Sequence, residues 1–239
     1  MAPKIRLHLD HPLAQGQTVP LTEAQAHYLF AVMRLGAGAV ISVINSRDGE
    51  WDGAVTPAGK RGGSVAVQAQ TAPLQLPPDL WLLFAPIKKA RTDFIVEKAV
   101  EMGVARILPV LTDFTNADRV RVDKLQAHAV EAAEQSGGTY VPQVSEPVRL
   151  LKLLDTWPET RSLWFCDEAL RGTATASSTN PGPAAILIGP EGGFSDAERT
   201  RLRSLPYARA ISLGPRILRA DTAAVAALTL WQITQGDWQ

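Results

Sequence analysis

Two stretches near the carboxyl end decide the fold of this 239-residue chain. The first, Ala184–Phe194, reads AAILIGPEGGF, and the second, Ala210–Ala223, reads AISLGPRILRADTA. Each begins with apolar residues and breaks into a glycine turn, which is typical of a strand buried on both faces whose end lets a ligand approach the backbone. Because the pattern occurs twice in close succession, it predicts a paired ligand site.

A helix signal follows each glycine turn. Ser195 precedes Glu198 by three residues, which is the spacing of a capping box, and Asp221 or Thr222 opens an alanine-rich run that continues to Leu230. The repeated unit is therefore strand, glycine turn and helix. Ligands of open parallel sheets bind outside the carboxyl ends of the strands, so the two turns are predicted to form a cofactor site.

The glycines could instead serve only tight turns, which is their commonest use. Two features favour a ligand site over this alternative. The motif occurs twice, and each turn carries a charged residue, Glu191 in the first and Arg219 in the second.

Composition bounds the class of protein. With 46% hydrophobic residues, the chain is long enough to bury the core of one large domain or of two small ones. Its single cysteine, Cys166, ends the apolar run Ser162–Cys166, which excludes an internal disulfide and favours a core residue over a nucleophile. No apolar run approaches a membrane span and no signal-peptide pattern is present, so we expect a cytoplasmic protein without a membrane partner.

The charge of the chain is balanced overall but uneven along the sequence. Because 24 Lys and Arg face 24 Asp and Glu, the net charge does not indicate a nucleic-acid partner. From Arg199 to Arg219, however, there are six arginines and no acidic residue. Such a run is usually solvated surface, but beside a cofactor turn it can also bind a phosphate backbone.

Residues 1–72 are predicted to form a small β-barrel, because short alternating segments are separated by turn clusters. These segments are Val40–Ile44, Glu50–Val55 and Ser64–Ala69. One helix is expected from Thr22 to Arg34, with Thr22 as its cap. Its apolar face would carry Ala26, Leu29, Phe30 and Met33. The proline-rich stretch Thr71–Asp79 predicts a linker that ends the domain.

Residues 80–239 alternate between strand and helix patterns. The first four elements expected are a strand at Leu80–Ala85, a helix at Arg91–Met102, a strand at Arg106–Leu111 and a helix at Val122–Gln135. Such alternation predicts an α/β fold with a parallel sheet covered on both faces.

The familiar catalytic fingerprints are missing. The sequence has no G-x-G-x-x-G after the first strand, no Walker lysine and no G-x-S-x-G elbow. Its four histidines and one cysteine have no metal-ligand spacing, so no metal is expected. What remains is a ligand held by backbone amides and carbonyls at the two glycine turns.

The paired segments Leu187–Phe194 and Leu213–Ala223 closely resemble the signatures of the SPOUT methyltransferases of the ribosomal RNA small subunit methyltransferase E family. Similarity extends over nearly the whole chain. Lys89 and Lys98–Val104 resemble the family stretch K…K-x-x-E-L-G-V, Glu131–Gly137 resembles A-x-E-Q-S/C-G, and Val32–Gly36 resembles V-L-R-L/M. The chain departs from the family at Gly138, which is often arginine there, and at Phe114, which is often basic.

The resemblance implies a PUA-like RNA-binding barrel for residues 1–72 and an AdoMet-binding SPOUT domain for residues 80–239. It further implies a carboxyl-terminal trefoil knot, which is a rare exception to the rules of chain threading. The implied cofactor is S-adenosyl-L-methionine. The implied partners are a second copy of the chain, in a homodimer with the active site near the subunit interface, and 16S rRNA in the small ribosomal subunit. The implied reaction is methylation of N3 of a uridine.

Two residues are candidates for catalysis. Uridine N3–H is a poor nucleophile in a paired base, so the enzyme must unstack the base and assist loss of the proton. Arg219 could stabilise the developing uridine anion, and Glu191 could act as base or orient the cofactor. A phosphate or dimer contact is an equally good reading of Arg219, and Glu191 could simply stabilise the amino terminus of the next helix.

The remaining candidates bind cofactor or RNA. The cofactor residues expected at the turns are Leu187, Ile188, Gly189, Glu191, Gly192, Gly193, Leu213, Gly214, Ile217, Leu218 and Thr222. The RNA-binding candidates are Arg6, Arg34, Lys88, Lys89 and Arg91. Three alternatives remain: a SPOUT enzyme that methylates transfer RNA or a ribose 2′-hydroxyl, an RNA-binding module without catalysis, and a nicotinamide oxidoreductase.

Overall fold

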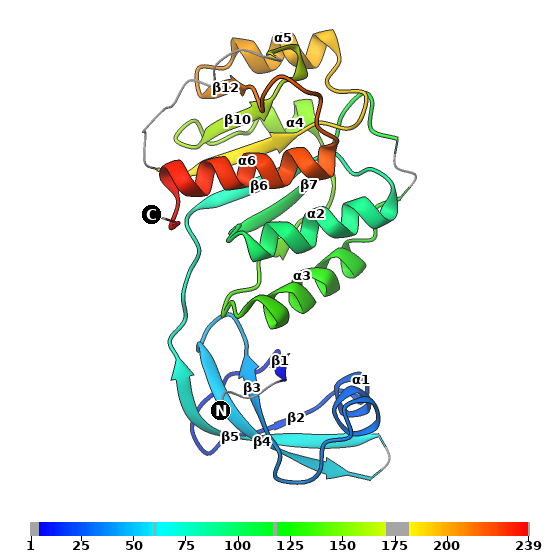
Figure 1. The fold of residues 1–239 in the computed structure, drawn as a ribbon, viewed down its shortest axis with the longest axis vertical. Helices are drawn as coiled ribbons and strands as arrows, with labels where there is room; N and C mark the ends of the chain where they lie inside the picture. Colours follow the sequence, from blue (N-terminus) through cyan, green and yellow to red (C-terminus); the bar gives the residue numbers. More distant parts are fainter. Residues whose placement is uncertain (1–4, 60, 117–118, 171–181, 239) are drawn as a thin grey trace. The chain divides into compact units, whose positions relative to one another are not determined.

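The computed structural model describes residues 5–59, 61–116, 119–170 and 182–238 (Figure 1). The chain divides into two compact units. One comprises Met1–Leu76 with Ala133–Val141, and the other comprises Pro77–Ala132 with Pro142–Gln239. The segment Ala133–Val141 therefore belongs by its contacts to the first unit, although it lies far along the chain from the rest of that unit.

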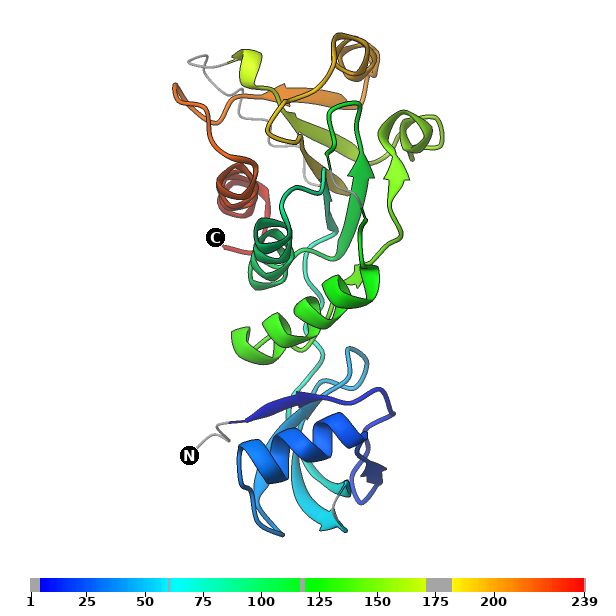
Figure 2. The ribbon, with the colours of Figure 1, turned by 90° about the vertical axis from the view of Figure 1, so that its right-hand side faces the viewer.

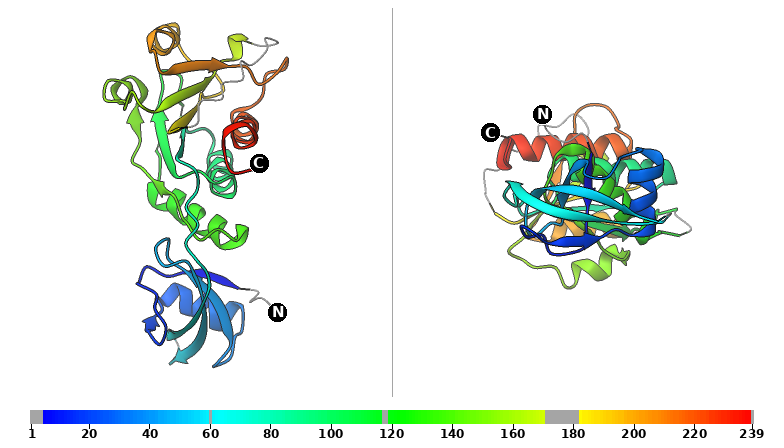
Figure 3. Two further views of the ribbon diagram at one scale, coloured as in Figure 1. Left: turned by 90° about the vertical axis from the view of Figure 1, so that its left-hand side faces the viewer. Right: turned by 90° about the horizontal axis from the view of Figure 1, so that it is seen from below.

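The first unit is built on one five-stranded, mostly antiparallel sheet. Its strands are β1 (Arg6–His8), β2 (Thr18–Pro20), β3 (Val40–Ile44), β4 (Glu50–Ala58) and β5 (Gly62–Ala72), in the order β1-β3-β4-β5-β2. Only β1 and β3 run parallel. Alternation along β5 buries Val65 and Val67 while Ala66 is exposed, and these valines pack with Val19, Val43 and Val55. The ribbon of this sheet is curved (Figure 3).

The expected helix of the first unit begins as predicted but widens. Thr22 caps α1 (Glu23–Ala26) in a capping box with Gln25, which confirms its predicted role. The chain then continues as a π-helix, η1 (His27–Val32), in which the Met33 N–H donates to the Tyr28 carbonyl five residues back at 2.9 Å. Because this wide turn rotates the following residue off the apolar face, Met33 is 42% exposed, and its predicted burial is wrong.

The second unit is built on a seven-stranded parallel sheet. Its strands are β6 (Leu80–Phe84), β7 (Arg106–Leu111), β8 (Gln143–Val144), β9 (Val148–Arg149), β10 (Ser162–Cys166), β11 (Ala184–Ile188) and β12 (Ala208–Ile211). They follow the order β12-β10-β11-β6-β7-β8, with β9 pairing off this path with β7. Every described pairing in this sheet is parallel, which confirms the predicted α/β class.

Helices cover both faces of this sheet, as Figure 2 shows with the sheet seen nearly edge-on. They are α2 (Lys89–Glu101), α3 (Val122–Ser136), α4 (Leu150–Leu154), η2 (Glu168–Leu170), α5 (Asp196–Ser204) and α6 (Ala220–Gln235). Helices α2 and α6 pack together on one face, and α4 and α5 lie on the other. Apolar side chains on both sides of β6 and β11 explain why these strands read as uninterrupted apolar runs.

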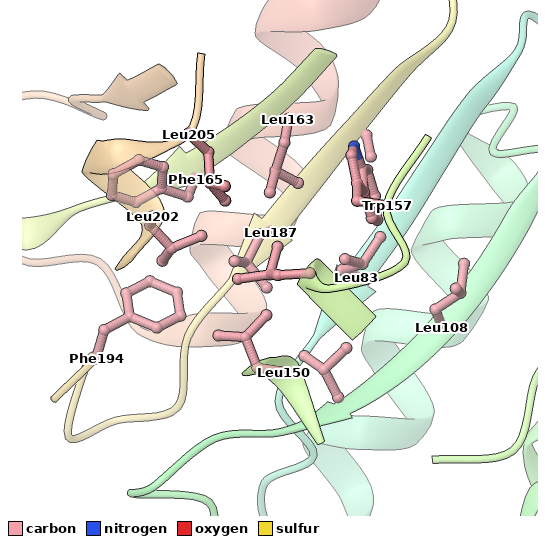
Figure 4. Close-up of a cluster of buried hydrophobic side chains, with 13 residues drawn as sticks. Leu83, Leu108, Leu150, Trp157, Leu163, Phe165, Leu187, Phe194, Leu202 and Leu205 are labelled. Carbon is pink, nitrogen blue, oxygen red and sulfur yellow. The ribbon is translucent and has the colours of Figure 1, made fainter. Parts of the chain in front are cut away.

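The core beneath α4 and α5 anchors the first glycine turn (Figure 4). Leu187 of β11 is fully buried there with Leu202 of α5. Phe194, the residue that ends the turn, is 3% exposed and meets Phe165 edge-on, with ring centroids 6.3 Å apart. A fully buried side chain of this size stabilises the fold by about 1.5–3 kcal/mol, so both ends of the turn are held by packing.

Candidate active site

A cleft lies at the carboxyl ends of three neighbouring strands. Strand β10 is hydrogen-bonded on one side to β11 and on the other to β12, so the segments that follow these strands meet at one edge of the sheet. The space in the cleft is about 700 Å³ when the open solvent at its mouth is included. Apolar walls from Ile188, Ile211 and Leu218 surround it.

The first glycine turn forms one wall of the cleft. The Gly193 N–H donates to the Pro190 carbonyl at 2.9 Å, and Gly193 has a positive φ of 69°. A Cβ atom on Gly193 would lie 2.8 Å from a carboxylate oxygen of Glu168. Glycine is therefore favoured there by its conformation, since the flexible end of Glu168 can move aside.

The second turn is open where a side chain would project. Gly214 has a φ of 104°, and no heavy atom lies within 4 Å of the position its Cβ would take. The turn ends at Arg219, which is exposed and is the N-cap residue of α6. Its backbone is extended, and its side chain makes no capping hydrogen bond to the helix. Asp221 or Thr222 was expected to open this helix. That expectation is wrong because the Arg219 carbonyl already accepts from the Ala223 N–H at 2.7 Å.

The first turn is tied to the segment that follows β7 by a buried carboxylate. Glu198 of α5 is 1% exposed, and its two oxygens accept from different backbone N–H groups, Asp113 at 2.9 Å and Ser195 at 3.0 Å. The Ser195 hydroxyl also caps α5 by accepting from the Glu198 N–H, so the predicted capping box is confirmed. The same hydroxyl donates to the Asp113 carboxylate at 2.5 Å.

The end of β10 supplies a third wall that the sequence analysis missed. Cys166, Asp167 and Glu168 all line the cleft. Burial raises the pKa of the Cys166 thiol to about 12, so the group stays protonated near neutral pH. The Asp167 side chain is 1% exposed and accepts from Arg203 at 2.7 Å, and Arg199 also pairs with it at 3.3 Å. Only the strand order brings this segment between the two glycine turns, and sequence spacing carries no sign of it.

Most of the predicted cofactor residues line the cleft. These are Ile188, Gly189, Glu191, Gly193, Leu213, Gly214, Ile217 and Leu218. Three others lie elsewhere: Leu187 points into the core, Gly192 faces solvent on the turn, and Thr222 is exposed on α6. Of the arginines in the basic run, Arg199 and Arg216 line the cleft, whereas Arg219 stands exposed at the end of the second turn.

Arg6, an RNA-binding candidate, is used inside the first unit. It donates twice to Glu50, at 2.6 and 3.0 Å, and its other bonds go to the carbonyls of Ala133, Glu134 and Gly138. These bonds occupy all five guanidinium donors. Arg6 thus joins β1 to β4 and to the segment Ala133–Val141, and it retains no donor for an RNA phosphate.

The other RNA-binding candidates are more accessible. Arg34 is exposed and follows η1 with a positive φ of 56°. Lys88 caps α2 and is exposed, and Lys89 is also exposed while pairing with Asp93 at 2.7 Å. Arg91 is half-buried, 3.8 Å from Asp221 of α6.

Neither a membrane-spanning helix nor a metal-binding cluster is found in the part of the chain that the structure describes. No helix there is long and apolar enough to cross a membrane. Within the same residues, no cluster of three or more His, Cys, Asp or Glu side chains could hold a metal ion.

Comparison with known protein families shows to which class of protein the chain belongs. Residues 74–232 match the RNA methyltransferase domain, and residues 21–68 match the RNA methyltransferase PUA domain. Together with a parallel sheet whose cleft opens between two glycine turns, these matches make the chain a two-domain RNA methyltransferase.

Individual relatives narrow the class to one family. Ribosomal RNA small subunit methyltransferase E of Rickettsia conorii is 27% identical over 228 residues, which cover 93% of each chain. The protein of that name from Synechocystis is 31% identical over 219 residues, 88% of this chain and 71% of that protein. The chain belongs to the ribosomal RNA small subunit methyltransferase E family, which confirms the resemblance seen in the two glycine motifs.

Solved structures agree with this assignment. The ribosomal RNA small subunit methyltransferase E of Neisseria gonorrhoeae, bound to S-adenosyl methionine, matches with a TM-score of 0.88 and 26% identity over 98% of this chain and 99% of that one. A putative methyltransferase of Legionella pneumophila, in complex with the cofactor SAM, matches with a TM-score of 0.89 and 26% identity over 98% of both chains.

Proposed function

We propose that this protein transfers a methyl group from S-adenosyl-L-methionine to N3 of a uridine in the 16S rRNA of the small ribosomal subunit. The observation that carries the proposal is the cleft between two glycine turns in a chain of this family. Its support comes from relatives named for small-subunit rRNA methylation and from similar structures described with the cofactor bound.

The residues of the cleft fit S-adenosylmethionine. Ile188, Leu213 and Leu218 offer apolar walls for a flat adenine ring, and the open space at Gly214 lets a ligand approach the backbone closely. The exposed carboxylate of Glu168 also lines the cleft and suits the positive charge of a sulfonium or an ammonium group, whereas the Asp167 carboxylate is buried and paired with Arg199 and Arg203. When bound, this cofactor supplies an electrophilic methyl group on sulfur.

The protein must then make N3 of uridine nucleophilic. Transfer joins the N3 lone pair to the methyl carbon, breaks the carbon–sulfur bond and releases the N3 proton. We assign stabilisation of negative charge on the uracil ring to Arg219, whose side chain has no hydrogen-bond or ion-pair partner among the described residues. Glu191, exposed on the cleft wall, is assigned to accept the proton or to orient the cofactor.

RNA binding is assigned to four cationic side chains, of which Arg34, Lys88 and Lys89 are exposed and Arg91 is half-buried. Arg34 serves the barrel, while Lys88, Lys89 and Arg91 at the start of α2 serve the methyltransferase domain. Arg6 is left out of this set because its donors are consumed by Glu50 and by backbone carbonyls.

We further propose a homodimer with the active site near the subunit interface. The outer face of α6 supports it, because this face is apolar where a solvated helix would be polar. Ile233 there is 55% exposed, and Val225, Ala226 and Leu230 are only half-buried. Ile217, which lines the cleft, is 62% exposed and adds to the apolar surface at the same end of the chain.

The remaining family properties belong to the same proposal. Residues 1–72 would serve as a PUA-like RNA-binding barrel and residues 80–239 as the methyltransferase domain, with the chain around the two turns threaded as a trefoil knot. A substrate in the ribosome implies a cytoplasmic protein.

One experiment tests the reaction, the atom and the substrate together. The purified protein would be incubated with methyl-labelled S-adenosylmethionine and with 30S subunits that lack their own modification, and the digested rRNA would be analysed by mass. A single 3-methyluridine is the expected product. Label in another nucleoside would refute the proposed target, and no label despite cofactor binding would refute the reaction on this substrate.

A further inference from the structure

An aromatic side chain stands exposed beside the first glycine turn. Phe114 follows β7 and is 51% exposed. Its Cβ lies 3.2 Å from the position that a Cβ atom of Gly192 would take, and Gly192 sits between Glu191 and Gly193, which both line the cleft. The ring is therefore mounted on the backbone of the turn that borders the cleft.

The segment that carries Phe114 is held rigidly. Its turn is closed by the Thr115 hydroxyl, which accepts from the Thr112 N–H at 2.8 Å. Asp113, which directly precedes Phe114, makes two further hydrogen bonds. Its N–H donates to the buried Glu198 carboxylate, and its own carboxylate accepts from the Ser195 hydroxyl. Because residues on both sides of Phe114 are held in this way, a ligand that covers the ring does not have to order the segment that carries it.

The surroundings of the ring favour one kind of ligand. Asp113 and Glu191, both exposed, bring negative charge close to Phe114, which disfavours a phosphate group at this point. A protein partner would be expected to cover a continuous apolar surface, as on α6, whereas Phe114 has polar and glycine neighbours. An unpaired nucleobase has a flat, uncharged face that stacks on an exposed aromatic ring.

We propose that Phe114 is a stacking platform for an unpaired base of the RNA substrate, at or next to the nucleotide that is methylated. This inference rests on the proposed function, because it deepens how the same site takes its substrate. Phe114 would position the RNA and take no part in the bond-making step. Its effect should therefore fall on the KM for RNA, while cofactor affinity stays unchanged.

The test compares variants of Phe114 in the full-length protein. Phe114→Ala and Phe114→Leu are expected to raise the KM for unmodified 30S subunits roughly ten- to a hundred-fold, the loss associated with one stacked base. Phe114→Leu still packs on Gly192 but lacks a ring, and Phe114→Trp, which keeps one, is expected to retain the wild-type KM. Leu151→Ala, at an apolar residue of α4 that is 41% exposed, is the control and is expected to have no effect on the KM.

Four results would overturn the inference, and they are distinguishable. A wild-type KM for Phe114→Leu would reduce the ring to a packing role, and an equal loss of S-adenosylmethionine affinity, measured by calorimetry, would make it a support of the cleft. Dissociation of a dimer in sedimentation of Phe114→Ala would identify a protein contact instead. If the wild-type protein itself transfers no methyl group, the proposed function fails first and the inference fails with it.

Discussion

The buried carboxylate of Glu198 offers the sharpest test of how the active-site turn is held. Its two oxygens accept two backbone N–H groups from segments far apart in sequence, Asp113 after β7 and Ser195 after β11. Glu198→Ala removes both acceptors and leaves the two part-buried N–H groups of Asp113 and Ser195 without this partner. Since a hydrogen bond to a charged group contributes about 1.5–3 kcal/mol, we expect a loss of roughly 3–6 kcal/mol in the free energy of unfolding.

Glu198→Gln tests whether both carboxylate oxygens are needed, because the side chain keeps its size. The amide has nearly the same shape but only one oxygen, so it can accept from Asp113 or from Ser195 but not from both. Its NH2 group must then face the other N–H. We therefore expect about half the loss, roughly 1.5–3 kcal/mol. A weaker affinity for S-adenosylmethionine should accompany it, because the first glycine turn ends at Phe194, directly before Ser195.

The assay is urea unfolding followed by tryptophan fluorescence, which reports on the second unit through the buried Trp157, Trp164 and Trp231. Asp196→Ala is the matched control, because Asp196 is an acid in the same helical turn whose side chain is fully exposed. It should leave the unfolding midpoint almost unchanged. A Glu198→Gln protein as stable as the wild type, with the same cofactor affinity, would refute the claim that two oxygens are needed.

Three further predictions concern the reaction, the first unit and pH. Arg219→Ala should abolish methyl transfer to 30S subunits while cofactor binding by calorimetry survives, because the side chain acts on the uracil ring. Arg209→Ala, at an exposed arginine of β12, should stay active, and unchanged turnover of Arg219→Ala would remove Arg219 from catalysis. Arg6→Ala should lower the free energy of unfolding of the first unit, measured in urea, by on the order of 3 kcal/mol, because Glu50 and three carbonyls lose their donor. The control Arg47→Ala, at an exposed site, should leave it unchanged. Equal stability of the two variants would contradict the stabilising role of the Arg6 hydrogen bonds. The wild type should lose stability as pH rises from about 9 towards 12, because the Cys166 thiol ionises near 9.0 when unfolded but only near 12 when folded, so the unfolded state releases its proton first. Cys166→Ala should be free of that part of the pH dependence, and identical pH profiles for the two proteins would show that the thiol is not desolvated.

Local pattern in the sequence was enough for the elements that build the site. The apolar run before Gly189 becomes β11, and Ser195 forms its capping box with Glu198. The run before Gly214 is only partly a strand, because β12 ends at Ile211 and lies at the edge of the sheet, where it is not buried on both faces as expected. These features depend on neighbouring residues, since apolar runs, glycine and a capping spacing act within a few positions of one another. The family signature could be read for the same reason, because it lies in two short segments.

Local pattern failed where a conformation depends on distant packing. The widened turn of η1 exposes Met33 against its periodicity, and α6 begins one residue earlier than its polar side chains indicate. Arg6 is of a residue type that commonly binds RNA, but all of its donors are hydrogen-bonded to Glu50 and to carbonyls of Ala133–Val141. Nothing near Arg6 in the sequence reveals those partners.

The sequence by itself determined most of the longer strands, where the glycine turns fall and to which family the chain belongs, because these follow from residues close together along the chain. The short strands β1, β2, β8 and β9 were not predicted. Tertiary structure alone decided what stands around the turns. Pairing of β10 between β11 and β12 brings Asp167 and Glu168 to the cleft, and the Glu198 carboxylate draws the Phe114 segment onto Gly192. Strand order and buried long-range hydrogen bonds are set by the packing of the whole domain, and no local sequence pattern encodes them.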